Sequence, residues 1–134
     1  MKPLFADTSF YVGLLNQDDE LFPLVKLYAE KPDLFVVTTE FVFVEVANFF
    51  ARSRFRQRAV DLYSRLSKSA FTRIIPASSE LFVKGITLYG SRRDKDWSLT
   101  DCCSFVVMEQ HKLDEALSSD KHFEQAGFQY LLKP

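Results

Sequence analysis

Glycine, proline, cysteine and long apolar runs are all scarce in this sequence of 134 residues. It has only 4 glycines and 5 prolines, too few for a disordered or low-complexity chain. A disulfide between its two neighbouring cysteines, Cys102 and Cys103, would be strained, which favours a reduced, cytoplasmic protein. No apolar run approaches the roughly 18 residues of a membrane span, and the start MKPLFADTSF has no signal-peptide core. We therefore expect one cytoplasmic domain over residues 1–134, with no membrane contact.

An excess of positive charge is also lacking, because the formal net charge is −1. This argues against a protein that binds nucleic acid through its overall positive charge, although nucleic acid remains possible as a substrate. Basic side chains gather locally between residues 52 and 73 and again at 92–95. A solvated helix face explains the first group about as well as a binding surface does.

Apolar residues make up 47% of the chain, enough for a real core, and their spacing predicts alternating strands and helices. The predicted strands are residues 3–6, 34–37, 74–75, 115–118 and 128–132. The predicted helices are residues 10–15, 18–30, 40–51, 57–67, 78–89, 98–111 and a short segment ending at 125. This alternation predicts an α/β domain with a mainly parallel sheet. In such sheets the ligand site lies beyond the carboxyl ends of the strands.

Three aspartates occupy positions where a site residue is expected. Asp7 follows the first predicted strand, Asp120 follows the fourth, and Asp101 lies in the first turn of the helix after a charged loop. Taken alone, each aspartate is explained about equally well by helix capping. Ser98 and Asp101 even have the spacing of a capping box.

Glu45 is harder to explain as a structural residue. Its neighbours one helical turn away include Phe41, Val42 and Phe49, so it is predicted to lie on an apolar helix face. A carboxylate in that setting is costly unless it is paired or binds a metal. A buried salt bridge to Arg52 or Arg54 is the alternative.

The four acids together predict a metal site, because they should converge at one edge of the sheet. Two unit charges about 6 Å apart cost roughly 3 kcal/mol at an effective dielectric constant of about 20. Such a cluster should take up protons or bind cations. Oxygen ligands favour Mg²⁺ or Mn²⁺, and no His/Cys spacing of the zinc type is present. A pair of such ions suits phosphodiester hydrolysis.

The order of the acidic motifs resembles a known family. The sequence reads DTS at 7–9, VEVAN at 44–48, LTD at 99–101 and SSDKHF at 118–123. This order and spacing are similar to those of the PIN domain, and most similar to the VapC-like toxins of bacterial and archaeal toxin–antitoxin pairs. The resemblance spans residues 4 to about 132.

The resemblance implies a three-layer α/β/α sandwich and a Mg²⁺- or Mn²⁺-dependent endoribonuclease that hydrolyses RNA. The acidic quartet that would hold the metal consists of Asp7, Glu45, Asp101 and Asp120. Thr8 and Ser118 match hydroxyl positions that orient these acids, and Asn48 matches a polar position one turn beyond the glutamate. Ser118 stands where the family often has threonine, a departure that keeps the hydroxyl.

The resemblance also implies further contacts and partners. A fifth acid would be Asp96, with Asp94 as the alternative. The arginines that could hold RNA phosphates are Arg92, Arg93 and Arg52. The partners would be a small antitoxin protein and a second copy of the chain in a homodimer.

Other functions and roles are also consistent with the sequence. An RNA-processing PIN-like nuclease outside a toxin–antitoxin system is one, and a catalytically silent PIN-like binding module is another. A haloacid-dehalogenase phosphatase would need an aspartate where Ser9 stands, and a phosphoacceptor receiver domain fits poorly. His122 is predicted to be a surface or capping residue rather than a substrate contact. Trp97 is predicted to pack against the following helix, with RNA stacking as the lesser alternative.

Overall fold

A single five-stranded sheet forms the centre of the molecule. The structure is a computed structural model that describes residues 2–134. The strands are β1 (Leu4–Ala6), β2 (Val36–Thr39), β3 (Thr72–Ile75), β4 (Glu115–Leu117) and β5 (Gln129–Tyr130). Their order is β3-β2-β1-β4-β5, and every pairing is parallel. The predicted α/β class with a mainly parallel sheet is confirmed.

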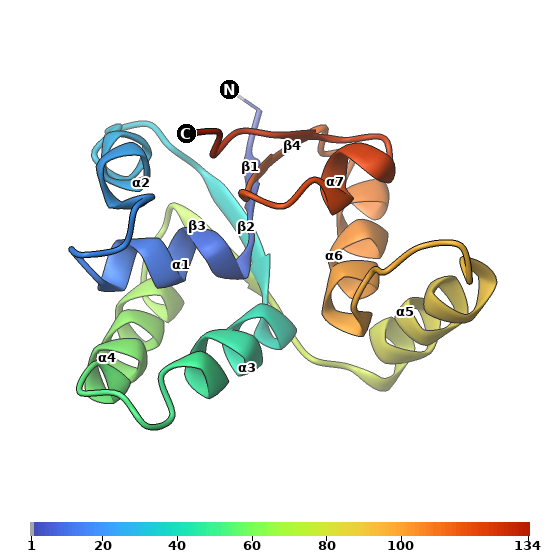
Figure 1. Ribbon diagram of the computed structural model, residues 1–134, viewed down its shortest axis with the longest axis horizontal. Helices are drawn as coiled ribbons and strands as arrows, with labels where there is room; N and C mark the ends of the chain where they lie inside the picture. Colours follow the sequence, from blue (N-terminus) through green and yellow to red (C-terminus); the bar gives the residue numbers. More distant parts are fainter. Residues whose placement is uncertain (1) are drawn as a thin grey trace.

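Helices cover both faces of this sheet (Figure 1). On one face lie α1 (Thr8–Leu15), α2 (Phe22–Ala29), α3 (Glu40–Phe49) and α4 (Arg56–Ser67). On the other lie α5 (Ser79–Ser91), α6 (Leu99–Gln110) and α7 (His122–Gln125). The predicted three-layer α/β/α arrangement is confirmed. No helix within residues 2–134 has the length and apolarity needed to cross a bilayer.

The chain reverses its direction of travel across the sheet at β1. It moves outward from β1 through β2 to β3, then returns to place β4 on the other side of β1. Connections on the two sides of such a switch point leave in opposite directions, which opens a crevice at the carboxyl ends of the central strands. The loops that follow β1 and β4 therefore border this crevice.

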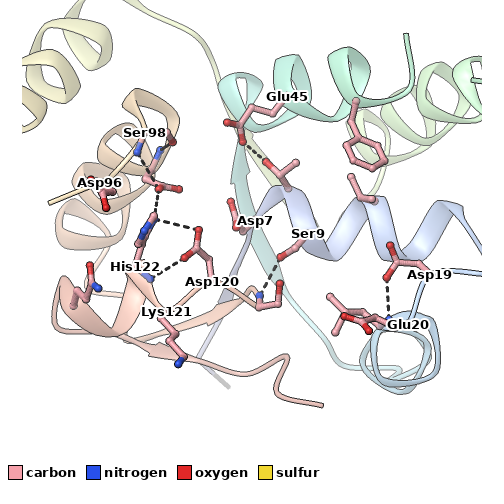
Figure 2. Close-up of a pocket in the computed structure, with 17 residues that line it drawn as sticks. Asp7, Ser9, Asp19, Glu20, Glu45, Asp96, Ser98, Asp120, Lys121 and His122 are labelled. Atoms are coloured by element: carbon pink, nitrogen blue, oxygen red, sulfur yellow. Dashed lines mark hydrogen bonds and ion pairs between the residues drawn. The ribbon is translucent and has the colours of Figure 1, made fainter. Parts of the chain in front are cut away.

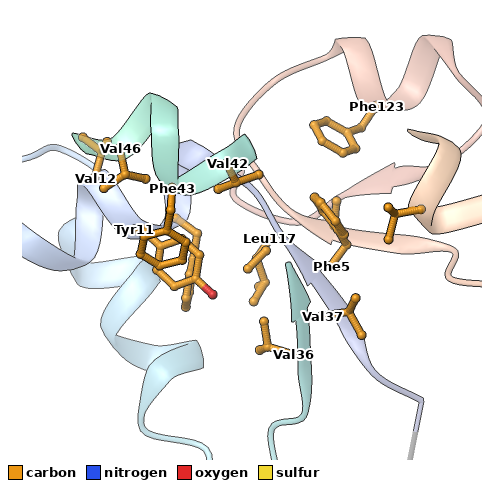
Figure 3. Close-up of a cluster of buried hydrophobic side chains, with 14 of the residues drawn as sticks. Phe5, Tyr11, Val12, Val36, Val37, Val42, Phe43, Val46, Leu117 and Phe123 are labelled. Carbon is orange, nitrogen blue, oxygen red and sulfur yellow. The ribbon is translucent and has the colours of Figure 1, made fainter. Parts of the chain in front are cut away.

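Aromatic packing joins the sheet to both helical layers (Figure 3). Phe5 on β1 lies fully buried with its ring centroid 6.2 Å from that of Phe123, which in turn makes an edge contact with Phe105 on α6. Across the sheet, Tyr11 on α1 packs on Phe43 of α3 at 4.9 Å. Fully burying such side chains contributes about 1.5–3 kcal/mol each, and it holds α1, α3 and α7 in place around the crevice.

Several element boundaries differ from the prediction by a few residues, and two of these differences have a clear local reason. The second strand extends through Thr39 because Thr38 bonds to the Ala6 carbonyl, at 2.8 Å, and only Thr39 caps the next helix. The second helix begins at Phe22, four residues later than predicted, with Pro23 in its first turn. Proline lacks the N–H that a helix interior needs, so the helix cannot extend far before it.

We expect Gly85→Ala to destabilise the fold. Gly85 is buried on α5 against α6, and a Cβ there would overlap the Cys103 sulfur. Cys103 is itself buried and has little room to move. Overpacking of this kind costs about 1–3 kcal/mol, partly offset by up to about 1 kcal/mol of helix propensity. Urea denaturation measures the change in the free energy of unfolding.

Gly90→Ala is the matched control, because Gly90 lies on the same helix with nothing within 4 Å of an added Cβ. It should be neutral or slightly stabilising. Equal effects of the two substitutions would show that the contact between α5 and α6 at Gly85 is not tight.

Candidate active site

A cleft of about 1030 Å³ opens at the carboxyl edge of the central strands, and its lining is strongly acidic (Figure 2). The structure brings the whole predicted quartet to it. The acidic residues that line it are Asp7, Asp19, Glu20, Glu45, Asp96, Asp101 and Asp120. Lys121 is the one lysine or arginine among the lining residues that the structure describes. An anionic substrate would therefore be repelled unless cations lay between it and the protein.

Asp7 lies at the end of β1, where the strand passes into α1. It occupies the N-cap position of α1, but its side chain makes no capping hydrogen bond. One carboxylate oxygen instead accepts a hydrogen bond from Ser118 Oγ at 2.8 Å. Burial, at 5% exposure, is the main reason why the pKa of Asp7 is raised to about 7; the hydrogen bond from Ser118 opposes this rise, and the negative charges of Asp101 and Glu45 add to it. The capping explanation of Asp7 is therefore wrong.

The Ser118 hydroxyl connects two of the acids. It is completely buried at the end of β4, where it donates to Asp7 and accepts the backbone N–H of Asp120 at 3.0 Å. A hydroxyl can donate once and accept at the same time, which a methyl group in its place could not do. Ser118 therefore orients Asp7 and the loop that carries Asp120.

Glu45 faces the cleft from α3 and is half-buried. Thr8 donates its hydroxyl hydrogen to Glu45 Oε1 at 2.5 Å. Val42 and Val46 take the buried face of the helix, so the glutamate is not enclosed in apolar surroundings as the prediction had it. Within residues 2–134, Glu45 forms no salt bridge with Arg52 or Arg54, and that alternative is wrong.

Asp101 forms the predicted capping box and also lines the cleft. Its backbone N–H donates to Ser98 Oγ at 3.0 Å, and its Oδ2 accepts the Ser98 N–H at 3.1 Å, a complete capping box. The same side chain lines the cleft with the residue only 7% exposed. The first turn of α6 therefore fixes this carboxylate at the helix N-terminus, where the helix dipole stabilises its charge.

His122 lies between two of the acids, which the sequence did not predict. Its Nδ1 is 3.0 Å from Asp101 Oδ2 and 3.2 Å from Asp120 Oδ2 (Figure 2). Its backbone N–H donates to Asp120 Oδ1 at 2.9 Å. Only the position of His122, two residues after Asp120, hinted at this arrangement.

Several predicted supporting residues lie away from the cleft that residues 2–134 form. Asn48 is exposed and lines a separate cavity beside α4. Arg52, Arg92 and Arg93 do not line the cleft either. Asp96 does line it. Of the two candidates for the fifth acid, Asp96 therefore lies at the cleft and Asp94 does not.

Side chains of the charged loop before α6 interact with one another. Arg92 forms an ion pair with Asp94 at 3.0 Å and stacks over the Trp97 ring at 4.9 Å from its centroid. Trp97 is buried, makes an edge contact with Phe105 and donates its N–H to Gln125 at 3.0 Å. The predicted packing role of Trp97 is confirmed, and RNA stacking on its ring is wrong.

Other lining residues were not singled out from the sequence. Asp19 and Glu20 come from the turn before α2, and Phe49 comes from the end of α3 with 64% of its surface exposed. Phe49 stands one turn after Glu45, and this spacing is the signal that could have identified it. Asp19 and Glu20 lie in a turn, where no periodic pattern marks a face.

Comparison with known protein families identifies the family of this chain. The family described as "PIN domain" matches residues 4–129. The chain belongs to the PIN domain family. The resemblance predicted from its acidic motifs is confirmed.

Individual relatives match this PIN domain over nearly its whole length. The 23S rRNA-specific endonuclease VapC20 of Mycobacterium tuberculosis, found in two strains, is 29% identical over 126 residues, which are 93% of this chain and 95% of VapC20. The crystal structure of that VapC20, described as a Sarcin-Ricin loop cleaving toxin, superimposes with a TM-score of 0.82 at 27% identity and covers 93% of this chain and 95% of that chain. The similarity to a VapC protein is thereby confirmed.

A more distant structure shares the fold. FitAcB from Neisseria gonorrhoeae matches with a TM-score of 0.62 at 18% identity, and 96% of each chain is covered.

Proposed function

We propose that this PIN domain is a divalent-metal-dependent endoribonuclease that hydrolyses RNA phosphodiester bonds, and that it is the toxin of a toxin–antitoxin pair. The observation that carries the proposal is the convergence of four carboxylates, Asp7, Glu45, Asp101 and Asp120, in one open cleft. VapC20, the relative described as a 23S rRNA-specific endonuclease and as a toxin, supports the choice of RNA and of the toxin role.

The residues of the cleft fit a bound Mg²⁺ or Mn²⁺. Carboxylate oxygens are the ligands that these hard cations prefer, and a cation would offset the negative charge of Asp101 and Glu45, which adds to burial in raising the pKa of Asp7. Asp7, Glu45 and Asp101 would hold the ion, with the help of Asp120. A bound cation would lower the pKa of the attacking water and neutralise charge on the phosphodiester. Ser118 and Thr8 would keep Asp7 and Glu45 oriented.

The proposal is tested by incubating the purified protein with ribosomal, transfer and messenger RNA in Mn²⁺ or Mg²⁺. We expect endonucleolytic cleavage of at least one RNA, and loss of that cleavage in EDTA. Cleavage that persists in EDTA would contradict the metal dependence. A metal-loaded protein that cuts no RNA would favour the silent binding module instead.

The proposed partners are a small antitoxin protein and a second copy of this chain. Apolar side chains exposed on α5 support an interface of this kind, and they are Phe82, Val83, Ile86 and Tyr89. Light scattering of the purified protein tests the homodimer. A short neighbouring gene for a DNA-binding protein would support the toxin role over general RNA processing.

We expect Phe49→Ala to raise the KM for an RNA oligonucleotide by roughly 5- to 100-fold with little change in kcat. Phe49 presents an exposed aromatic face to the acidic cleft, and base stacking contributes about 1–3 kcal/mol per base. Steady-state cleavage kinetics measure both constants.

Phe71→Ala is the control, because Phe71 is 55% exposed but lies away from the cleft. An equal rise in KM in both variants would show that Phe49 has no specific contact with RNA.

A further inference from the structure

Three potential ligand atoms lie unusually close together inside the cleft. His122 Nδ1 is 3.0 Å from Asp101 Oδ2 and 3.2 Å from Asp120 Oδ2. One ligand atom from each of the three residues can be chosen so that all lie within 4.8 Å of one another. Figure 2 shows the His122 imidazole pointing to the Asp120 carboxylate. The imidazole is therefore part of the acidic cluster and not a neighbour on its rim.

The two distances from His122 Nδ1 are close to the distance between neighbouring ligands around one ion. An octahedral ion with ligands at about 2.1 Å places adjacent ligand atoms about 3 Å apart. Both distances from Nδ1 match that value within a few tenths of an ångström. A cation could bind all three atoms without a large movement of the backbone.

Each of the three residues makes a further hydrogen bond that helps to hold it in this arrangement. The capping box with Ser98 fixes Asp101, and Ser118 holds the backbone N–H of Asp120. The backbone N–H of His122 bonds to Asp120 Oδ1, which sets the start of α7 against that carboxylate. Contacts of this kind are what keep metal ligands pre-positioned in proteins.

We propose that His122 supplies a nitrogen ligand, through Nδ1, to a cation held by Asp101 and Asp120, and that the site therefore prefers a first-row transition cation such as Mn²⁺ to Mg²⁺. Imidazole suits transition metals, whereas Mg²⁺ is bound by oxygen and water. The inference rests on the proposed metal dependence and adds the ligand that would select the ion.

If the His122 imidazole donated hydrogen bonds instead of binding the metal, its substitution would have the opposite effect on cation binding. If Nδ1 carries a proton, the imidazole donates hydrogen bonds to both carboxylates and competes with any cation for them. Removing it would then strengthen cation binding or leave it unchanged. Removing a true ligand would weaken it.

The test measures Mn²⁺ and Mg²⁺ binding to the full-length protein without RNA, by titration calorimetry and by the electron paramagnetic resonance of Mn²⁺. We expect tighter binding of Mn²⁺ than of Mg²⁺ by wild type. His122→Ala should weaken Mn²⁺ binding by at least about 10-fold and Mg²⁺ binding much less, so that the preference shrinks. Electron spin echo envelope modulation should detect a nitrogen bound to Mn²⁺ in wild type, and this measurement needs no variant.

His111→Ala is the matched control, because His111 is the other histidine of the chain and lies at the distant C-terminus of α6. It should leave both affinities unchanged. Unchanged or tighter Mn²⁺ binding by His122→Ala, or no nitrogen coupling in wild type, would overturn the inference. RNA cleavage by a protein without nitrogen coupling would leave the proposed function standing, whereas nitrogen-coupled Mn²⁺ without cleavage would reject the function alone.

Discussion

Asp7→Asn is expected to lower RNA cleavage by at least about 100-fold in either Mg²⁺ or Mn²⁺. Asp7 lies at the centre of the cleft, close enough to Asp101 and Glu45 for their charges to raise its pKa. Substituting residues that only support metal ligands already costs about 10- to 100-fold, so removing a proposed ligand should cost more. Asparagine keeps an oxygen that can accept the Ser118 hydrogen bond, so the fold should survive. Single-turnover cleavage with excess protein measures the loss.

The control for this substitution is Asp33→Asn, an exposed aspartate outside the cleft. The substitution removes the same charge, and the variant should cleave RNA as wild type does. Wild-type cleavage by Asp7→Asn would show that the proposed site is wrong, even if the protein proves to be a nuclease.

The metal-free protein is expected to lose stability as the pH rises from about 4 to about 7. The pKa of Asp7 is raised to about 7 in the folded protein, from 3.8, chiefly because the side chain is buried. Between these values the folded state keeps a proton that the unfolded state releases, so the free energy of unfolding falls as the pH rises. One pKa unit corresponds to about 1.4 kcal/mol, so the loss is on the order of 3–4 kcal/mol. Denaturation in EDTA across this range measures it.

Asp7→Asn should remove most of this pH dependence, because asparagine resembles the protonated acid and cannot ionise. In EDTA at pH 8 the variant should therefore be more stable than wild type, and near pH 4 the two should be similar. Saturating Mn²⁺ should stabilise wild type far more than the variant, since a ligand of the folded state alone adds stability. A variant less stable than wild type at pH 8 in EDTA would contradict the account of Asp7.

Local sequence patterns predicted the elements well where one side chain controls the backbone. Ser98 and Asp101 form the predicted capping box, because both partners lie within one helical turn. The boundary before α2 was harder, since the apolar spacing continued beyond the point where Pro23 limits the helix.

The candidate site was predictable in its residues but not in its contacts. Strand ends and motif order pointed to Asp7 and Asp120, yet could not decide whether Asp7 caps a helix or faces a cleft. The bond from Ser118, 111 residues away along the chain, decides it. A local sequence pattern cannot predict a contact between two residues that lie so far apart in the chain.

The sequence by itself determined the α/β class, the parallel sheet and the acids at the strand ends, because residue period and capping act over one or two turns. Only the tertiary structure decided that Asp96 and not Asp94 lines the cleft, that Asn48 and the arginines lie outside it, and that His122 lies between two carboxylates. The positions of Asp96 and His122 depend on how the start of α6 packs beside the loop after β4. That packing is set by the buried contact of Phe105 with Phe123, between segments that are neighbours only in the folded chain.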